Sequence, residues 1–494
     1  MKQLWKMLLL LGAVLFGFAS CSDDDKAEEP KEAKMLTFGF YQEDNKDLLS
    51  TDYEATINGN EISVSLPALI DKSALVARFT LSDNAIAIVE ADVQESGVSS
   101  NDFSIPVDYF VTNGEINEKY TVTVSKAADG QWSKLAAFTT DSIMECEMKT
   151  SPVNNQLYVV YKMNKDESVD EKAAMITYKN DAWDFVGGRS ISNGRVTGVT
   201  MNFAADGTPY VAYSDYTNTV DGATLQSSSM RKLNGSSWAA VGSEAITNIK
   251  SGINAFGFKA DGNPIHFTKA EAANTTYGVA KREFIISDFN GSSWTMNGKI
   301  PGRDATWAGY LIKTKQVGNT IYVGVLNQTG SNSFSIYKYE NNAWTTLIDK
   351  YSQKEEAKFN IYDFDMDVDS KGNVYILAAD NAPDYASVYK PTLFMYDSEE
   401  KEISKIGDQI QENMSTGREF DLAIAPNGTP YVLYRDESKY PTIIYLDSET
   451  YQWVEPKTLE AIEADNLTLT ISKSGVIYAG YVNTDDCLIV QKFE

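Results

Sequence analysis

Short segments rich in apolar residues recur along almost the whole chain. In many of these segments apolar and polar residues alternate. Alternation with a period of two, interrupted by Gly, Asn and Asp, is typical of strands with one buried face. Over most of the chain this pattern is itself periodic. A short strand that usually carries tryptophan returns every 50 to 59 residues, at Trp132, Trp183, Trp238, Trp294, Trp344, Ile403 and Trp453. Between these positions lie apolar runs of the type Tyr-Val-Ala-Tyr, at residues 157–161, 210–213, 265–267, 321–325, 374–377, 431–434 and 477–481.

A period near 50 residues, with several short strands in each unit, predicts the blades of a β-propeller. The two ends of the repeat carry complementary pieces. Residues 131–136 contain a tryptophan strand without inner strands, and residues 466–493 contain inner strands without a following tryptophan strand. If the first piece completes the sheet of the last, seven blades close and no sheet edge stays free. We therefore predict an all-β chain in which residues 128–494 form a seven-bladed propeller closed by its N- and C-terminal strands.

Residues 35–127 do not share the repeat. They contain short alternating runs separated by turn signals such as Asn58-Gly59-Asn60, at residues 36–40, 53–57, 62–66, 74–80, 85–89, 102–107 and 120–124. About seven short strands in a segment of this length predict a β-sandwich. This pattern, together with the segment from Ser96 to Phe103, resembles the immunoglobulin-like modules that precede larger domains in bacterial surface lipoproteins. The resemblance implies a spacer or a docking module.

The first 34 residues have the pattern of an export signal and a tether. Residues 1–20 combine Lys2 and Lys6 with an apolar run that is too short to span a membrane. The sequence Phe-Ala-Ser before Cys21 resembles the cleavage box of bacterial lipoproteins, which implies lipidation of Cys21; an ordinary secretory signal is the alternative.

An acidic run, Ser-Asp-Asp-Asp, follows Cys21 directly and opens a polar tether over residues 21–34. It resembles the surface-export signal of lipoproteins from glycan-utilisation systems of Gram-negative bacteria, and a solvated tether without further meaning is the alternative. The resemblance implies a lipid anchor in the outer membrane, exposure to the cell exterior, and a neighbouring glycan-import complex as a partner.

The chain carries 69 acidic and 43 basic side chains, with a net charge of −26. Nucleic acid is excluded as a partner because binding to phosphate backbones needs a cationic surface. After the signal no apolar run approaches 18 residues, so we expect a protein that is anchored to a membrane and does not span it. Cys146 and Cys487 fall in the first and last blades, where they either pair across the seam or remain two buried thiols.

Candidate binding residues gather on one face of the predicted ring. A propeller blade runs from strand a at the axis to strand d outside, and sites generally lie where the b–c and d–a loops meet; we call this the loop face. A Gly-Arg pair before strand a occurs three times, at Arg195, Arg303 and Arg418. Guanidinium groups suit carboxylate or sulfate ligands, although pairing with an Asp of the next loop is an equal alternative.

Two further residue types are candidates on this face. Trp307 has no partner in the repeat and is suited to stacking on a sugar ring, with a local core role as the alternative; Tyr216, Tyr385 and Tyr440 are secondary candidates of the same kind. Polar residues follow strand b in all seven blades, at Asn164, Asp215, Lys269, Asn327, Asp380, Asp436 and Asn483. Of these, Asp215, Asp380 and Asp436 are candidate acceptors for a ligand, and capping of local turns is the alternative.

The sequence favours binding over catalysis. The single histidine, His266, makes a Ser-His-Asp or His-based metal site improbable, and we expect no cofactor. Asp365, Asp367 and Asp369 form a pattern that resembles calcium loops of integrin-type propellers. Ser370 replaces the usual Gly and no other blade repeats the pattern, so alternation in a half-exposed strand is the preferred explanation. We predict a non-catalytic surface lipoprotein whose ligand is an extracellular glycan. The alternatives are a polysaccharide lyase or hydrolase, using Arg303, Arg418 and a tyrosine or His266, and a scaffold that binds a surface protein.

Overall fold

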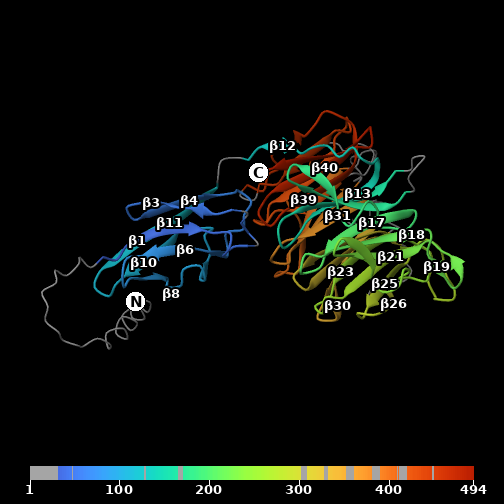
Figure 1. Ribbon diagram of the computed structural model, residues 1–494, viewed down its shortest axis with the longest axis horizontal. Helices are drawn as coiled ribbons and strands as arrows, with labels where there is room; N and C mark the ends of the chain where they lie inside the picture. The colour runs from blue at the N-terminus through green and yellow to red at the C-terminus, as the bar shows by residue number, and fades with distance from the viewer. Residues whose placement is uncertain are drawn as a thin grey trace. The chain divides into compact units, whose positions relative to one another are not determined.

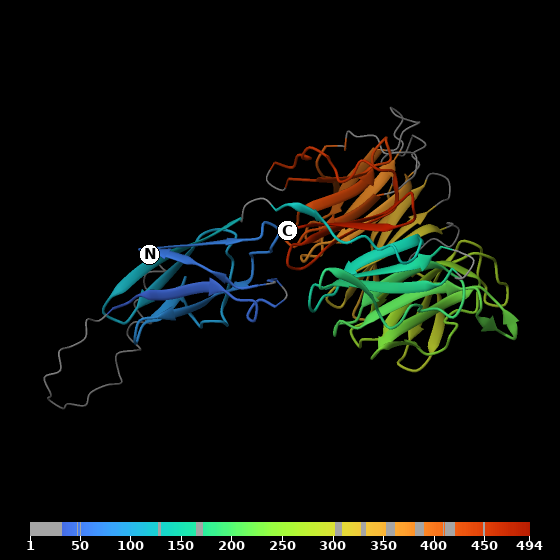
Figure 2. The same ribbon diagram turned by 45° about the horizontal axis from the view of Figure 1, so that its top comes forward.

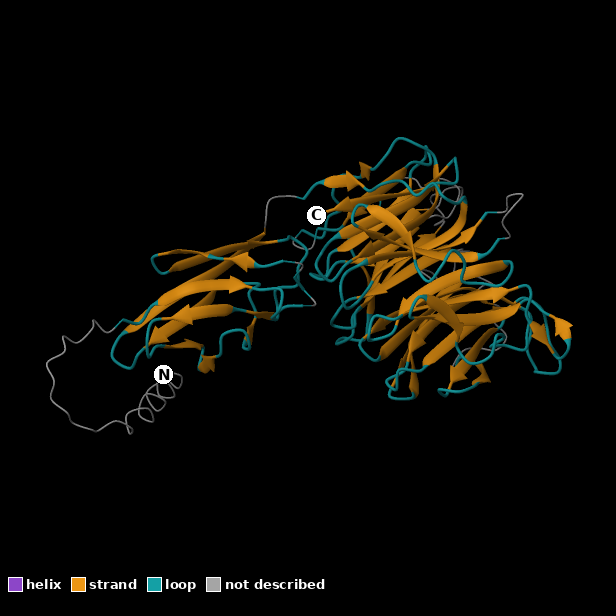
Figure 3. Cartoon of the chain, viewed as in Figure 1, coloured by secondary structure: helices purple, strands orange, loops and turns teal. Residues whose placement is uncertain are grey.

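The computed structural model describes residues 32–46, 48–49, 51–126, 130–164, 171–301, 309–327, 332–351, 361–380, 390–408, 410, 420–447 and 450–494, with the backbone alone for residues 362, 380 and 390. Every regular element in these residues is a strand (Figure 3). Within the same residues, no helix has the length and apolar character needed to cross a membrane. The chain forms two compact units, Met1–Gly130 with Lys473–Gly475, and Gln131–Ser472 with Val476–Glu494 (Figure 1).

The first unit is a sandwich of two sheets. One sheet has the order β2 (Tyr53–Glu54), β1 (Met35–Phe40) and β6 (Arg78–Leu81). The other has the order β3 (Thr56–Asn58), β4 (Glu61–Leu66), β11 (Asn117–Lys126), β10 (Val107–Thr112), β7 (Ile86–Val89) and β8 (Asp92–Gln94), and β5 (Leu75–Val76) pairs separately with β9 (Ser100–Asn101). Strands β4 and β11 are parallel, whereas the other neighbours are antiparallel.

Aromatic side chains fill the space between these sheets. Phe38, Phe40 and Phe103 pack edge to face with ring centroids 4.9–6.4 Å apart, an arrangement that aromatic quadrupoles favour. Phe103 lies outside the strands, which corrects the strand expected over residues 102–107. Asp102 instead accepts a hydrogen bond from the Ser104 amide in a local turn, and β10 begins only at Val107, after a proline.

The second unit contains seven four-stranded antiparallel sheets, which we call blades 1 to 7. From strand a outward, blade 1 contains β13 (Ile143–Thr150), β14 (Leu157–Met163), β15 (Ala173–Lys179) and β16 (Ala182–Phe185), and blade 2 contains β17 (Val196–Phe203), β18 (Pro209–Asp215), β21 (Ser227–Asn234) and β22 (Ser237–Ala240). Blade 3 contains β23 (Ser251–Phe258), β24 (Pro264–Ala270), β25 (Phe284–Phe289) and β26 (Trp294–Lys299), and blade 4 contains β27 (Gly309–Val317), β28 (Thr320–Asn327), β29 (Ser333–Glu340) and β30 (Ala343–Tyr351). Blade 5 contains β31 (Ile361–Val368), β32 (Val374–Asp380), β33 (Lys390–Tyr396) and β34 (Ile403–Lys405). Blade 6 contains β35 (Phe420–Ile424), β36 (Pro430–Arg435), β37 (Pro441–Tyr445) and β38 (Lys457–Thr458). Blade 7 contains β39 (Ala464–Ile471), β40 (Ile477–Asn483), β41 (Leu488–Phe493) and β12 (Trp132–Lys134). A short hairpin of β19 (Thr219–Val220) and β20 (Ala223–Thr224) extends the b–c loop of blade 2.

The ring closes as predicted, through strands from the two ends of the chain. Strand β12 pairs antiparallel with β41, with Trp132 opposite Phe493 and Lys134 opposite Gln491. Each innermost strand contacts that of the next blade, and β39 contacts β13. In Figure 2 the red sheet of blade 7 accordingly lies beside the cyan sheet of blade 1. The predicted seven-bladed propeller is therefore confirmed.

The repeated sequence signals have local structural causes. Strand b is buried on both faces, and Tyr161, Tyr213, Tyr434 and Tyr481 on these strands are fully buried, which explains the recurring apolar runs. Gly207 and the equivalent glycines of the a–b hairpins have positive φ, as their turns require.

The tryptophans connect neighbouring blades. The indole N–H of Trp238 donates to the Val186 carbonyl of the preceding blade at 2.8 Å, and those of Trp183, Trp294 and Trp453 donate in the same way. Trp453 differs from expectation in one respect: it forms an isolated bridge with Leu446, and the outer strand of blade 6 is β38.

We expect Trp238→Phe to lower the free energy of unfolding by about 1 kcal/mol, because it removes one hydrogen bond between blades and keeps most of the ring contact. Urea denaturation followed by fluorescence measures this loss. Trp344→Phe is the matched control, because the Trp344 ring packs on Tyr339 and no hydrogen bond joins its indole to another described residue. Equal losses in the two variants would show that packing, not the hydrogen bond, stabilises the joint.

Candidate functional site

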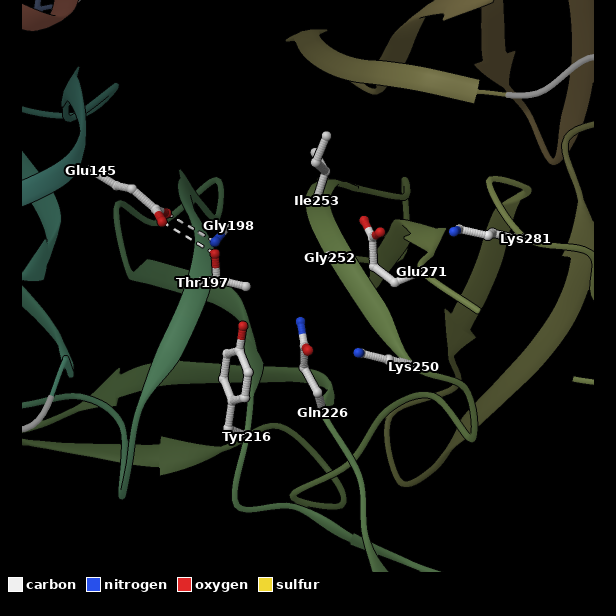
Figure 4. A pocket seen from close by; sticks show the side chains of 10 residues that line it. All are labelled: Glu145, Thr197, Gly198, Tyr216, Gln226, Lys250, Gly252, Ile253, Glu271 and Lys281. Atoms are coloured by element: carbon white, nitrogen blue, oxygen red, sulfur yellow. Dashed lines mark hydrogen bonds between the residues drawn. The ribbon is translucent and has the colours of Figure 1, made fainter. Parts of the chain in front are cut away.

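The loop face carries a pocket of about 550 Å³ between blades 1, 2 and 3. Its lining comes from the starts of three innermost strands and from b–c and d–a loops: Glu145, Thr197, Gly198, Tyr216, Gln226, Lys250, Gly252, Ile253, Glu271 and Lys281 (Figure 4). Most of these groups are polar or charged, with a single aromatic ring. The pocket thus lies on the face where the sequence placed the binding residues.

Glu145 is a fixed wall of the pocket. Its carboxylate accepts hydrogen bonds from the Gly198 amide at 2.9 Å and from the Thr197 hydroxyl at 3.2 Å (Figure 4). The Lys162 ammonium, which is almost fully buried, lies 3.7 Å from the same carboxylate. Glu145 therefore joins blades 1 and 2, and its negative charge is balanced before any ligand binds.

Two glycines form the floor: a side chain on Gly198 would meet backbone, whereas one on Gly252 would displace the flexible Glu271 side chain. A Cβ on Gly198 would lie 2.4 Å from the Gly252 carbonyl oxygen, and one on Gly252 would lie 2.2 Å from the Glu271 carboxylate. Beneath them, the Asn254 amide donates to the Gly198 and Gly252 carbonyls at 3.0 and 3.1 Å. These contacts hold the floor in one conformation.

His266 belongs to this supporting layer and has no access to solvent. The side chain is fully buried, and its Nε2 donates to Asn254 Oδ1 at 3.0 Å. Burial lowers the pKa of His266 to about 3, so the ring is neutral at physiological pH. This corrects the suggestion that His266 acts in a lyase site: the ring cannot reach a substrate on the loop face.

Tyr216 and Arg195 form one unit at the edge of the pocket. The Arg195 guanidinium lies over the Tyr216 ring, 4.6 Å from its centroid, and forms an ion pair with Glu171 of blade 1. The Tyr216 hydroxyl points into the pocket, near Thr197 and Gln226 (Figure 4). Arg195 thus connects two blades, which agrees with the structural alternative from the sequence; it does not line the pocket, and ligand binding by Arg195 stays a prediction.

Asp215 and Asp436 serve their own turns. Asp215 accepts hydrogen bonds from the Thr217 amide and hydroxyl at 2.7 and 2.6 Å. Asp436 accepts from the Ser438 and Tyr440 amides at 2.8 and 2.9 Å. Neither residue lines the pocket.

The remaining sequence candidates cannot be placed in the site. Asp380 ends β32, and its side chain is not described. The residues Cys21, Arg303, Trp307, Tyr385 and Arg418 lie outside the described residues.

Asp365, Asp367 and Asp369 have structural partners. Asp365 and Asp367 accept hydrogen bonds from backbone amides of β35 at 2.9 and 2.8 Å, which connects blades 5 and 6. Asp369 accepts from the Lys371 and Asn373 amides in its hairpin at 3.0 and 2.9 Å. No group of three or more metal-binding side chains occurs in the part of the chain that is described. Contacts between strands thus explain the pattern that resembled a calcium loop.

Charged residues on the innermost strands of blades 4, 5 and 6 form a second polar feature. Lys313 lies 3.2 Å from Asp365, and Lys315 lies 3.4 Å from Asp367. Burial and the neighbouring Asp365 raise the pKa of Asp421 well above its usual value. We call this set the axial charge cluster: Lys313, Lys315, Asp363, Asp365, Asp367 and Asp421.

The cysteines of the described residues are Cys146 and Cys487. Cys146 and Cys487 are both partly exposed and do not form a disulfide. The structure thus agrees with the unpaired alternative from the sequence, but not with full burial.

Sequence reasoning missed several lining residues of the pocket. Glu145, Gln226, Lys250 and Lys281 belong to no motif, and their residue types are common in loops and exposed strands. The usable signal was their place on the loop face, because Gln226 and Lys281 follow strand b and Lys250 precedes strand a. Tyr216, a secondary candidate, lines the pocket, and its role in binding stays a prediction.

Three comparisons with known proteins add to this geometry. Residues 47–124 match the family model described as SGBP, N-terminal, that is, the N-terminal domain of surface glycan-binding proteins. No curated protein matches the sequence.

Similar solved structures include a lectin from Burkholderia pseudomallei, with 10% identity, a TM-score of 0.49, and coverage of 71% of this chain and 95% of that chain. They also include an ulvan lyase, with 11% identity, a TM-score of 0.48, and coverage of 72% and 95%. A lectin from Aleuria aurantia has 14% identity, a TM-score of 0.38, and coverage of 60% and 91%. Values this low transfer neither a ligand nor an activity to this chain.

Proposed function

We propose that this chain is a cell-surface protein that binds an extracellular glycan in the pocket between blades 1, 2 and 3, without cleaving it. The observation that carries the proposal is the pocket itself: one tyrosine at the edge of a concave, polar site with a rigid floor. Sugars present many hydroxyl groups and apolar C–H faces, so their sites combine several hydrogen-bonding groups with an aromatic ring.

The N-terminal unit supports the cellular setting. Residues 47–124 match a family model named for surface glycan-binding proteins, which favours a surface location and a glycan ligand. A lipid anchor at Cys21 in the outer membrane and a neighbouring glycan-import complex remain part of the proposal, resting on the sequence resemblance. Binding of a surface protein alone is the competing function.

We expect Tyr216→Ala to abolish the retardation of the protein in affinity gels that contain its polysaccharide, because the ring and hydroxyl at the edge of the pocket are lost. Tyr445→Ala is the matched control, since Tyr445 is exposed on the outer part of blade 6, outside the pocket lining. Trp307→Ala tests the residue proposed from the sequence and should weaken binding in the same assay.

The proposal fails if no polysaccharide in a broad panel retards the protein, or if Tyr216→Ala leaves retardation unchanged. Release of unsaturated sugars, followed by ultraviolet absorbance, would replace binding with lyase activity. Capture of a surface protein without binding to any polysaccharide would establish the scaffold function instead.

A further inference from the structure

The acidic side chains that line the pocket have partners of opposite charge, whereas in the described part of the chain the lysines that line it do not. Both lining carboxylates have a cationic partner, because Glu145 lies 3.7 Å from Lys162 and Glu271 lies 3.1 Å from Lys269. The two lining lysines, Lys250 and Lys281, have no carboxylate partner among the described residues. The pocket therefore has a surplus of positive charge in a chain whose net charge is −26.

Both lysines are exposed, and their ammonium groups point toward the pocket (Figure 4). The Lys250 carbonyl accepts a hydrogen bond from the Glu271 amide at 2.8 Å, which fixes the backbone where blade 3 begins. Lys281 projects from the b–c loop of the same blade, just before β25.

We propose that the pocket selects an anionic glycan, whose carboxylate or sulfate group binds Lys250 and Lys281. This inference rests on the proposed glycan function and names its ligand class. Charge-assisted hydrogen bonds from ammonium groups to carboxylate or sulfate are stronger than those to neutral hydroxyls. Both acidic side chains of the pocket already have cationic partners, so they repel an anion less than free carboxylates would. A neutral sugar would leave two ammonium groups partly desolvated without a counter-charge.

The negative charge of the whole protein does not cancel this local surplus. Salt screens the long-range repulsion of an anionic ligand, whereas the two lysines act over contact distance. A chain of sugars that carries one acidic group on each residue or repeat unit fits this combination. The Tyr216 ring and the Gln226 amide then remain for the sugar itself.

Affinity electrophoresis with matched polysaccharide pairs tests the inference. The pairs are polygalacturonate with its methyl ester, and dextran sulfate with dextran; poly-glutamate serves as an anion without sugar. We expect retardation by at least one anionic glycan and not by its neutral counterpart, and weaker retardation at higher salt. Lys250→Gln with Lys281→Gln should weaken binding about 100-fold, that is, about tenfold for each charged hydrogen bond.

The matched control is Lys405→Gln with Lys457→Gln, which removes the same charge from exposed lysines on the outer strands β34 and β38. Its affinity should stay within twofold of the wild type, and circular dichroism verifies the fold of both double variants. Retardation by neutral glycans alone, lost in Tyr216→Ala, would overturn the anionic class and leave the glycan function standing. Equal retardation by poly-glutamate would also overturn it. Binding to no glycan at all would overturn the proposed function itself.

Discussion

Deletion of the last strand, residues 488–494, is expected to abolish the cooperative unfolding transition of the propeller. Strand β41 pairs with β40 on one side and with β12 on the other, so its loss opens blade 7 and frees β12. Leu488 and Val490 are fully buried in the core that also contains Ile143 of the first blade and Phe138, which precedes that blade. Each such side chain contributes about 2–4 kcal/mol, and together with the ladder they approach the 5–15 kcal/mol that stabilises a typical domain.

Differential scanning calorimetry measures the effect of the deletion, and a point variant gives the same test with the chain length unchanged. Val490→Asp places an unpaired carboxylate in the closed core, which costs several kcal/mol. Glu494→Ala, at an exposed position, is the control and should leave the transition near its wild-type temperature. A synthetic peptide of residues 488–494 should partly restore the transition of the truncated protein. A truncated chain that unfolds like the wild type would contradict closure through β41.

We expect Asp421→Asn to stabilise the protein above neutral pH and to have a much smaller effect near pH 4. The pKa of Asp421 is raised by burial and by the adjacent Asp365 carboxylate. Such a group contributes stability that is complete below its unfolded pKa, about 3.9, and that is lost as the pH rises through its folded pKa. Asparagine does not titrate, so the variant does not lose stability in this way as the pH rises. We therefore expect the gain from Asp421→Asn to be present at pH 8 and to shrink as the pH falls toward 4.

Thermal unfolding between about pH 4 and pH 8 measures the difference between the variant and the wild type. Asparagine can still accept the hydrogen bond that the Leu469 amide donates to Asp421 at 2.7 Å. The pKa of Asp365 is shifted the other way: burial acts to raise it, but Lys313 and other neighbours outweigh burial and lower it. Asp365→Asn is therefore the contrasting control and should reduce stability at neutral pH. A constant difference for Asp421→Asn across the pH range would contradict the assigned protonation.

Other charged groups near Asp421 also affect how the stability depends on pH. Asp363 and Asp367 share the axial charge cluster, and both Lys313 and Lys315 keep their charge because nearby aspartates outweigh burial and raise their pKa values. The lysines do not titrate between pH 4 and pH 8. The changing part of the profile therefore belongs to carboxyl groups, and the variant isolates the contribution of Asp421.

The architecture of the propeller was determined by sequence signals that act locally. Strand alternation, Gly at positive φ in the hairpins, and one tryptophan in most outer strands each depend on a few adjacent residues, so they can be read in one dimension. Ring closure also followed, because the unmatched pieces at residues 131–136 and 466–493 complete each other. The strand expected over residues 102–107 was wrong for a local reason as well, since Asp102 forms a turn.

The binding pocket and the partners of the charged residues were decided only by the tertiary structure. Lys250 and Lys281 lie in different loops of blade 3, and Glu145 lies in blade 1. Their spacing along the chain therefore does not predict that all three line the same pocket. The spacing of Asp365 and Asp367 resembles a metal loop but is also typical of an alternating strand. Only the position of β35 shows that their oxygens bind the amides of the next blade. The alternation of apolar and polar residues predicts which face of a strand a side chain occupies. Its contact partner is determined by the packing of segments that are distant in the sequence.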